Sequence, residues 1–289
     1  MTRQSNSGEA LPSHPLAPLS EASSGTERIA AAFQAAKGEG RAALMPYMMA
    51  GYPDREASLA VAAAYVENGA DLVELGVPFS DPLADGPTIH AAATAALEAG
   101  ATLEMSLEVC DSISGRVPVV LMAYANMVLA HGGAEEFAEQ ALAAGAAGAI
   151  VPDLPLEEAE AVRGAFAEVG LALVPLVAPT TPAERRVRIC AAAQGFIYVV
   201  STVGTTGERE ELPVELTDLV LATKAEAEAP VAVGFGIGTP EQVAQVGEVA
   251  DGVIVGSRLV RAAGEAEGAE GAAEAVGAFL REARAALAG

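Results

Sequence analysis

The chain has 289 residues, and its 16 Lys and Arg against 39 Asp and Glu give a formal net charge of −23 at pH 7. So acidic a chain repels phosphate polymers and anionic lipid, which excludes nucleic acid and membrane surfaces as partners. Hydrophobic residues make up 52%, enough for a large core, and no apolar run is as long as the roughly 18 residues of a membrane span. With only two cysteines and no signal-peptide pattern, we expect a soluble, cytoplasmic protein.

The rare residue types exclude two kinds of chemistry. The only lysines, Lys37 and Lys224, lie in polar, helix-like stretches, whereas a Schiff-base enzyme needs a lysine on a buried element. The three histidines, His14, His90 and His131, are scattered along the chain, so no zinc site is expected.

In chain order, residues 1–26 are rich in Ser, Pro and Gly and predict a flexible tail. A first helix is expected from near Glu27 to just before Gly38, and residues 27–289 are expected to form one domain. Short apolar runs then alternate with Ala-rich amphipathic stretches, and a glycine suited to a helix C-cap precedes several of the runs. The eight runs are 42–49, 71–77, 117–124, 147–151, 171–177, 196–201, 231–235 and 252–255.

Eight such units over about 250 residues predict a (β/α)8 barrel, and strands that are apolar on both faces fit parallel strands covered by helices. The alternative is an open doubly wound sheet, which should show a Gly-rich turn after its first strand. The first run instead ends in MAGYPD, without a G-x-G-x-x-G pattern, so the barrel is favoured.

Glu74 interrupts the second apolar run and therefore points either into the barrel or into the helix layer. A carboxyl group in apolar surroundings has a raised pKa, which suits a general acid/base near neutral pH. The competing interpretation is a structural ion pair with an arginine. The loop that follows carries Ser80, Asp81 and Asp85 among three prolines, at the end of the barrel where active sites lie, so two carboxylates can flank one substrate.

The last two predicted strands end in glycines, at Gly234-Phe235-Gly236-Ile237-Gly238 and at Gly256-Ser257. Barrels bind phosphate with backbone N–H groups in these two loops, so we expect a phosphate site here. The Gly/Thr-rich loop 202–209 is either a mobile lid or a plain connector.

Several segments together resemble the tryptophan synthase alpha chain family. They are LMPYMMAGYPD (44–54), GADLVELGVPFSDPLADGPTI (69–89), LMAYANMV (121–128), GAIVPDLPLEE (148–158), YVVSTVGTTG (198–207), VGFGIGTPEQV (233–243) and IVGS (254–257). The resemblance implies a barrel lyase that splits indole-3-glycerol phosphate into indole and glyceraldehyde 3-phosphate by a retro-aldol reaction.

The resemblance also implies residue roles. Glu74 matches the acid/base that acts on the glycerol hydroxyl and the indole ring carbon, and Asp85 matches the carboxylate that accepts the indole N–H. Tyr198 matches a tyrosine near the catalytic glutamate, and Thr206 matches a lid threonine. The remaining matches are to walls of the indole pocket (Tyr47, Tyr124, Ile150 and Phe235) and to phosphate-binding positions (Gly207, Gly236, Gly256 and Ser257).

The family works as a heterotetramer of two alpha and two beta chains, in which the beta chain carries pyridoxal phosphate and no cofactor is expected in this chain. Asp81, Asn126 and Pro152 match surfaces that face the beta chain. Tyr47 stands where many relatives have Phe, Thr202 where Arg is frequent, and His90 at a variable position. Three alternatives stay open: a phosphoribosylanthranilate isomerase, an indole-glycerol-phosphate synthase, and a silent subunit that only activates a beta chain. The lack of lysines at strand ends argues against the synthase.

Overall fold

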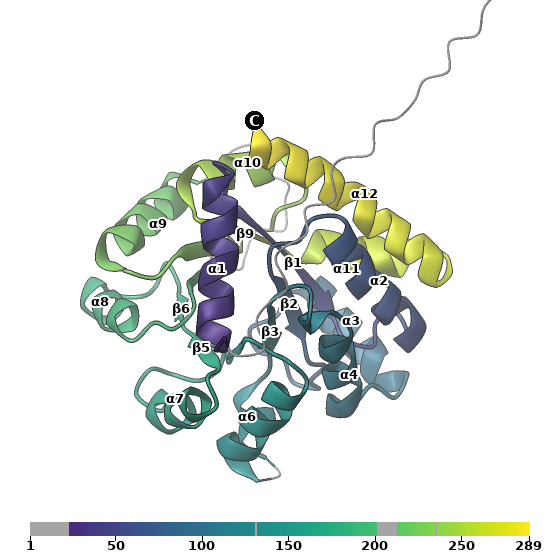
Figure 1. The fold of residues 1–289 in the computed structure, drawn as a ribbon, viewed down its shortest axis with the longest axis horizontal. Coiled ribbons are helices and arrows are strands. Elements are labelled where there is room, and N and C mark those ends of the chain that lie inside the picture. Colours follow the sequence, from purple (N-terminus) through teal and green to yellow (C-terminus); the bar gives the residue numbers. More distant parts are fainter. Residues whose placement is uncertain (1–22, 131, 201–212, 235) are drawn as a thin grey trace, which may run out of the picture.

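The computed structural model describes residues 23–130, 132–200, 213–234 and 236–289. Its strands are β1 (Ala43–Met49), β2 (Val73–Gly76), β3 (Val119–Met122), β4 (Gly148–Ile150), β5 (Ala172–Val174), β6 (Leu176–Val177), β7 (Ile197–Val200), β8 (Val231–Gly234) and β9 (Gly252–Val255). Every pairing between them is parallel, in the order β5-β4-β3-β2-β1-β9-β8-β7-β6. The strands curve into a nearly closed barrel (Figure 1), which confirms the predicted fold.

The barrel closes through Pro175. The predicted fifth strand, 171–177, is split by this proline into β5, which pairs with β4, and β6, which pairs with β7. Proline has no N–H to donate to a neighbouring strand, so the ladder is interrupted at this residue and the two halves pair with different strands. Eight strand positions therefore surround the axis, as the sequence predicts.

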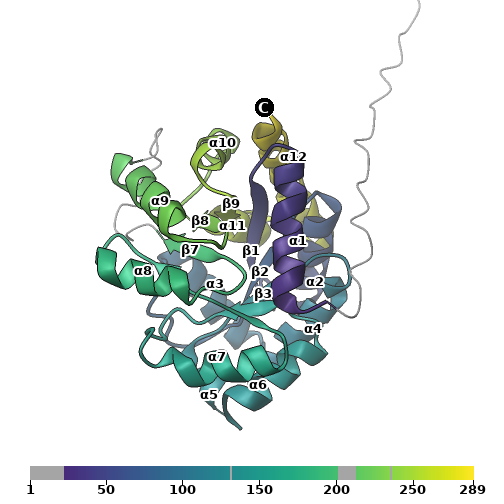
Figure 2. The same cartoon turned by 60° about the vertical axis from the view of Figure 1, so that its left-hand side comes forward.

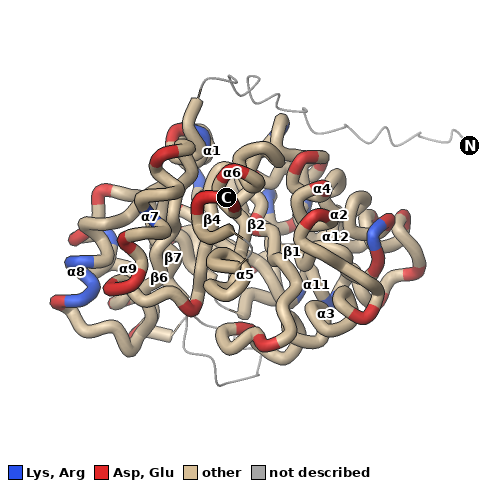
Figure 3. The backbone as a smooth tube through the Cα atoms, turned by 90° about the horizontal axis from the view of Figure 1, so that it is seen from below, with Lys and Arg blue, Asp and Glu red and all other residues tan. Residues whose placement is uncertain are grey.

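Helices surround the strands (Figures 1 and 2). They are α1 (Gly25–Gly38), α2 (Arg55–Glu67), α3 (Pro87–Glu98), α4 (Leu103–Ser114), α5 (Ala125–Leu129), α6 (Gly133–Ala143), α7 (Ala159–Glu168), α8 (Ala183–Ala191), α9 (Val214–Glu226), α10 (Pro240–Val249), α11 (Ser257–Glu265) and α12 (Gly268–Ala288). In the described part of the chain we find no helix with the length and hydropathy needed to span a bilayer. The acidic residues lie on most of these helices, while α8 carries a group of arginines (Figure 3).

Helix α1 covers the amino-terminal mouth of the barrel. Its Ile29 and Phe33 are buried with Leu72, Phe196 and other interior residues in one cluster. The helix begins at Gly25, two residues before the predicted start, because the side chains of Ser24 and Glu27 form a capping box. This end of the barrel is therefore packed with side chains.

Glycines follow the ends of four helices as the sequence predicts, three of them directly after the C-cap residue and Gly195 three residues after the C-cap of α8. Gly69, Gly145, Gly170 and Gly195 have φ values of 87°, 74°, 78° and 72°, a region that favours glycine, and each lies shortly before a strand. These turns lead each helix back to the start of the next strand.

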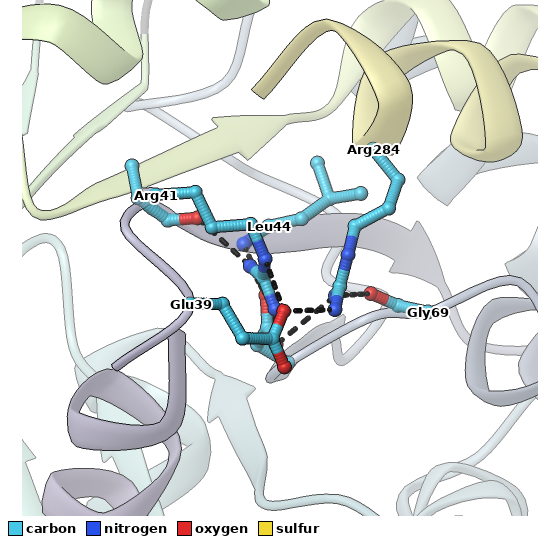
Figure 4. Close-up of polar contacts among 7 residues, drawn as sticks. Glu39, Arg41, Leu44, Gly69 and Arg284 are labelled. Atoms are coloured by element: carbon cyan, nitrogen blue, oxygen red, sulfur yellow. Dashed lines mark hydrogen bonds and ion pairs between the residues drawn. The ribbon is translucent and has the colours of Figure 1, made fainter. Parts of the chain in front are cut away.

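A buried ion-pair network joins the starts of β1 and β2 to helix α12 (Figure 4). The Asp71 carboxylate accepts hydrogen bonds from Arg41 at 2.6 and 2.8 Å, from the backbone N–H of Leu44 at 2.7 Å and from Arg284 at 3.3 Å. Arg284 also donates to the Gly69 carbonyl oxygen and to Glu39. The network lies at the amino-terminal ends of the strands, away from the ends where catalysis is expected.

Candidate active site

Glu74 points into the barrel. It shares its face of β2 with Leu72, which belongs to the interior cluster, while Val73 and Leu75 pack in the outer layer against the helices. Only 1% of Glu74 is exposed, and its Oε2 atom has no hydrogen-bond partner, arginine included, among the residues that the structure describes. Of the two orientations left open by the sequence, the structure therefore shows the interior one, and no arginine in the described part of the chain forms the alternative ion pair with Glu74.

Burial controls the charge of Glu74. Loss of solvation raises its pKa to about 8, with a smaller contribution from the negative charge of Asp85. Its Oε2 atom is buried and makes no hydrogen bond to the residues that the structure describes. At neutral pH this carboxyl group is therefore mostly protonated and able to donate a proton.

Asp85 lies in the loop between β2 and α3 and is half-buried. Burial raises its pKa to about 6, while a hydrogen bond from the Tyr124 hydroxyl and the nearby His90 oppose the rise. The same Tyr124 hydroxyl accepts a hydrogen bond from the backbone N–H of Ala84 at 3.0 Å, and the Tyr124 ring stacks on Phe79 with the ring centroids 5.0 Å apart. Tyr124, at the end of β3, thus fixes the loop that carries Asp85.

The two carboxyl groups interact electrostatically, and their pKa values lie on either side of neutrality. Between about pH 6 and 8 Asp85 is ionised while Glu74 keeps its proton. Two carboxyl groups whose environments separate their pKa values in this way can act as one acid and one base or electrostatic stabiliser.

Two tyrosines enter the barrel by the same geometric relationship. Tyr47 on β1 pairs in register with Glu74, and its hydroxyl lies against Gly76, two residues further along β2. Tyr198 on β7 pairs with Ala232, and its hydroxyl lies against Gly234, two residues further along β8. A Cβ atom at either glycine would overlap the tyrosine ring, so glycine is required there.

The structure describes only some of the remaining predicted site residues. Ile150 is buried in the interior cluster at the end of β4. Gly236 and Gly256 follow the ends of β8 and β9, which are neighbours in the barrel, and Ser257 begins α11. Thr202, Thr206, Gly207 and Phe235 lie outside the described residues.

Backbone geometry after β8 and β9 is compatible with anion binding. Gly236 has a φ of 26°, and α11 begins at a glycine N-cap, so no side chain caps its first N–H groups. Exposed N–H groups at a helix N-terminus carry a partial positive charge that attracts anions. Neither lysine is needed for this: Lys37 lies at the end of α1, and Lys224, on α9, is paired with Asp251 at 2.8 Å.

Three residues predicted to face a partner follow three consecutive strands, Asn126 in the short helix α5 and the other two in loops. Asp81 follows β2, Asn126 follows β3 and Pro152 follows β4, and at least part of each is accessible to solvent. Since parallel strands end at the same side of the barrel, these residues lie on the side that also carries Asp85.

A separate cavity of about 520 Å³ lies between α7 and α8, lined by Leu156, Glu157, Glu160, Arg163, Arg188, Ala191 and Ala192. It includes neither Glu74 nor Asp85, so it is distinct from the two-carboxylate site.

Sequence reasoning missed the steric role of two glycines. From the sequence, a glycine at position 76 indicates only open space beside Glu74, whereas in the structure Gly76 receives the Tyr47 ring and Gly234 receives the Tyr198 ring. The signal in the sequence was that each tyrosine lies on one predicted strand and each glycine at the end of the next strand along the chain. The register between strands, which the sequence does not state, is needed to connect them.

The comparisons with known proteins agree with one another. The family model described as tryptophan synthase alpha chain matches residues 33–288. The tryptophan synthase alpha chain of Synechococcus sp. (strain CC9902) is 51% identical over 259 residues, which cover 89% of this chain and 96% of the relative. The corresponding protein of Carboxydothermus hydrogenoformans is 46% identical over 81% of this chain and 88% of its own length.

Solved structures are similar over the same extent. A structure of tryptophan synthase from Mycobacterium tuberculosis superposes with a TM-score of 0.83 at 40% identity, covering 90% of this chain and 98% of that chain. Tryptophan synthase subunit alpha from Legionella pneumophila gives a TM-score of 0.82 at 39% identity, with the same coverage.

Proposed function

This chain belongs to the tryptophan synthase alpha chain family, a family of lyases that cleave indole-3-glycerol phosphate, and we propose that Glu74 and Asp85 perform this reaction. The observation that carries the assignment is the pair of interacting carboxyl groups at the barrel mouth, with pKa values of about 8 and about 6.

The reaction uses each carboxyl group in its neutral-pH state. Protonated Glu74 donates its proton to the indole ring carbon that bears the glycerol chain, while the Asp85 carboxylate accepts the ring N–H and stabilises the positive charge that develops. The Glu74 carboxylate then removes the proton from the adjacent glycerol hydroxyl. As the carbon–carbon bond breaks, its electrons return to the ring, which releases indole and the aldehyde, and Glu74 has regained its proton.

The other predicted residues bind the substrate. Tyr198 orients the reacting groups near Glu74, and Tyr47, Tyr124, Ile150 and Phe235 form the walls around the indole ring. Gly207, Gly236, Gly256 and Ser257 bind the phosphate through backbone N–H groups and the Ser257 hydroxyl, and Thr206 helps to orient Asp85.

Alpha chains of this family form complexes with a beta chain, and we propose the same for this chain, as a heterotetramer of two alpha and two beta chains. Asp81, Asn126 and Pro152 provide part of the contact. Pyridoxal phosphate belongs to the beta chain, and the proton transfers above require no cofactor here. In the described residues no cluster of three or more metal-ligating side chains occurs. We further propose that residues 27–289 form one catalytic domain and that the complex works in the cytoplasm.

The test is incubation of the purified chain with indole-3-glycerol phosphate, with and without a beta chain, while indole release is followed. We expect indole in both cases and faster release with the beta chain. A chain that binds and activates a beta chain but releases no indole would instead be a silent subunit, and the function proposed here would be wrong.

A further inference from the structure

Tyr47 and Glu74 are neighbours on adjacent strands inside the barrel. They are paired in the register of β1 and β2, and parallel strands lie about 4.8 Å apart. Tyr47 follows Ala43 and Met45, which are both in the interior cluster, along the inward face of β1. The two side chains therefore start from adjacent points and extend into the same space.

Both side chains end in buried polar atoms without a hydrogen bond. The Tyr47 hydroxyl and Glu74 Oε2 are inaccessible to solvent and have no partner among the residues that the structure describes. An unsatisfied buried polar group destabilises the folded state, whereas a phenylalanine ring at position 47 would carry no such penalty. Polar groups kept at such a cost are typical of functional sites.

The surroundings of Tyr47 define how its hydroxyl can act. The groups that face it are the carboxyl groups of Asp85 and Glu74 and the phenols of Tyr124 and Tyr198, and His90 acts on it only through Asp85. Burial and these carboxyl groups raise the pKa of Tyr47 well above its usual value, so the phenol stays protonated. Because Gly76 has no side chain, the Tyr47 hydroxyl can lie against β2 at a point two residues beyond Glu74. The pair thus offers one hydrogen-bond donor next to one proton acceptor.

A hydroxyl group is the substrate feature that satisfies both atoms, since its oxygen accepts a hydrogen bond and its proton can be donated. Building on the proposed function, we propose that Tyr47 donates a hydrogen bond to the oxygen of the glycerol hydroxyl from which Glu74 removes the proton. As that proton leaves for the Glu74 carboxylate, electron density rises on the oxygen, and the hydrogen bond from Tyr47 strengthens. Tyr47 then has a catalytic function in addition to its ring contact with indole.

The experiment separates this hydrogen bond from contact by the ring. Dissociation constants are measured for indole-3-glycerol phosphate and for an analogue with hydrogen in place of the reacting hydroxyl. Both are measured on Glu74→Gln, which is expected not to turn over, and on the double variant Glu74→Gln/Tyr47→Phe. We expect the second substitution to weaken substrate binding about tenfold, the value of one hydrogen bond, and analogue binding less than twofold. With Glu74 intact, Tyr47→Phe should lower kcat/KM more than tenfold, because KM rises with the loss of the hydrogen bond and kcat also falls as that bond strengthens in the transition state.

The control is Tyr65→Phe, which also removes a buried phenol hydroxyl. The Tyr65 hydroxyl donates to the Tyr47 carbonyl oxygen at 2.9 Å, so this variant should lower the melting temperature and change the binding of both ligands by the same factor. Tyr47→Phe should keep or raise the melting temperature, because it removes an unsatisfied group. Equal weakening of substrate and analogue, or weakening of neither, would overturn the inference about Tyr47 and leave the proposed function intact. A Glu74→Gln protein that binds neither ligand, together with a wild-type chain that releases no indole, would contradict both.

Discussion

Arg41 and Asp71 form a buried, two-pronged ion pair, with the guanidinium nitrogens 2.6 and 2.8 Å from the two carboxylate oxygens. Replacing Asp71 by Ala removes the two-pronged partner of buried Arg41, leaves it only the ion pair with Glu39, and removes the acceptor for the Leu44 N–H, so we expect a loss of about 3–5 kcal/mol in the free energy of unfolding. Urea denaturation measures this. The matched control is Glu108→Ala, which breaks the exposed pair with Arg55 and should cost less than about 1 kcal/mol. Similar losses for the two variants would show that the network adds no special stability.

Glu74→Gln should lower the rate of indole release at least a hundredfold, because a positioned acid/base contributes about 10²–10⁴ to the rate and the amide cannot transfer the proton. Binding to the beta chain should persist, since Glu74 lies inside the barrel and not on its surface. The control is Glu98→Gln on the exposed face of α3, which should keep full activity. Turnover of Glu74→Gln close to that of the wild type would refute the role of this carboxyl group.

The pH dependence of kcat/KM should be bell-shaped. Activity needs ionised Asp85, which is lost below about pH 6, and protonated Glu74, which is lost above about pH 8. Indole release at subsaturating substrate across pH 5 to 9 checks both limbs. A profile that stays flat between pH 5 and 9 would exclude the two carboxyl groups as the titrating pair.

Protein stability should also depend on the charge of Glu74. Its folded pKa of about 8 exceeds the ordinary value of 4.5, so the favourable contribution of the neutral group is complete below about pH 4.5 and is lost as the pH rises through 8. Glutamine does not titrate. The melting temperature of Glu74→Gln minus that of the wild type should therefore increase from pH 5 to pH 9. A constant difference over this range would mean that Glu74 is ionised throughout or well solvated.

Gly234→Ala should impair catalysis more than stability. Its new Cβ would displace the Tyr198 ring, whose Cζ atom would be only 2.8 Å away, and we expect kcat/KM to fall about tenfold or more. The comparison variant is Gly164→Ala in α7, where a Cβ meets nothing within 4 Å and helix propensity improves by about 1 kcal/mol. Kinetics and thermal melting of both variants are the measurements. Unchanged kinetics of Gly234→Ala would mean that the position of Tyr198 does not matter for the reaction.

The sequence was sufficient for the barrel because apolar periodicity and helix-ending glycines are local signals. It also identified Glu74 as a polar residue in an apolar strand. It left the direction of the side chain open, because the alternation of side chains along a strand shows which residues share a face but not which face points into the barrel. The contacts of Tyr47 with Gly76, and of Arg284 with Asp71 across 213 positions of the chain, depend on strand register and on where α12 packs. Such contacts are products of the assembled fold, so no local pattern could predict them.

Helix α1 closes the amino-terminal end of the barrel, where Ile29 and Phe33 are buried among the interior side chains. In the part of the chain that the structure describes, that end gives no access to Glu74, so ligands would enter and leave by the opposite end, which carries Asp85. Indole and the aldehyde would then leave by the end through which the substrate enters. A protein bound over that end would control both substrate entry and product release.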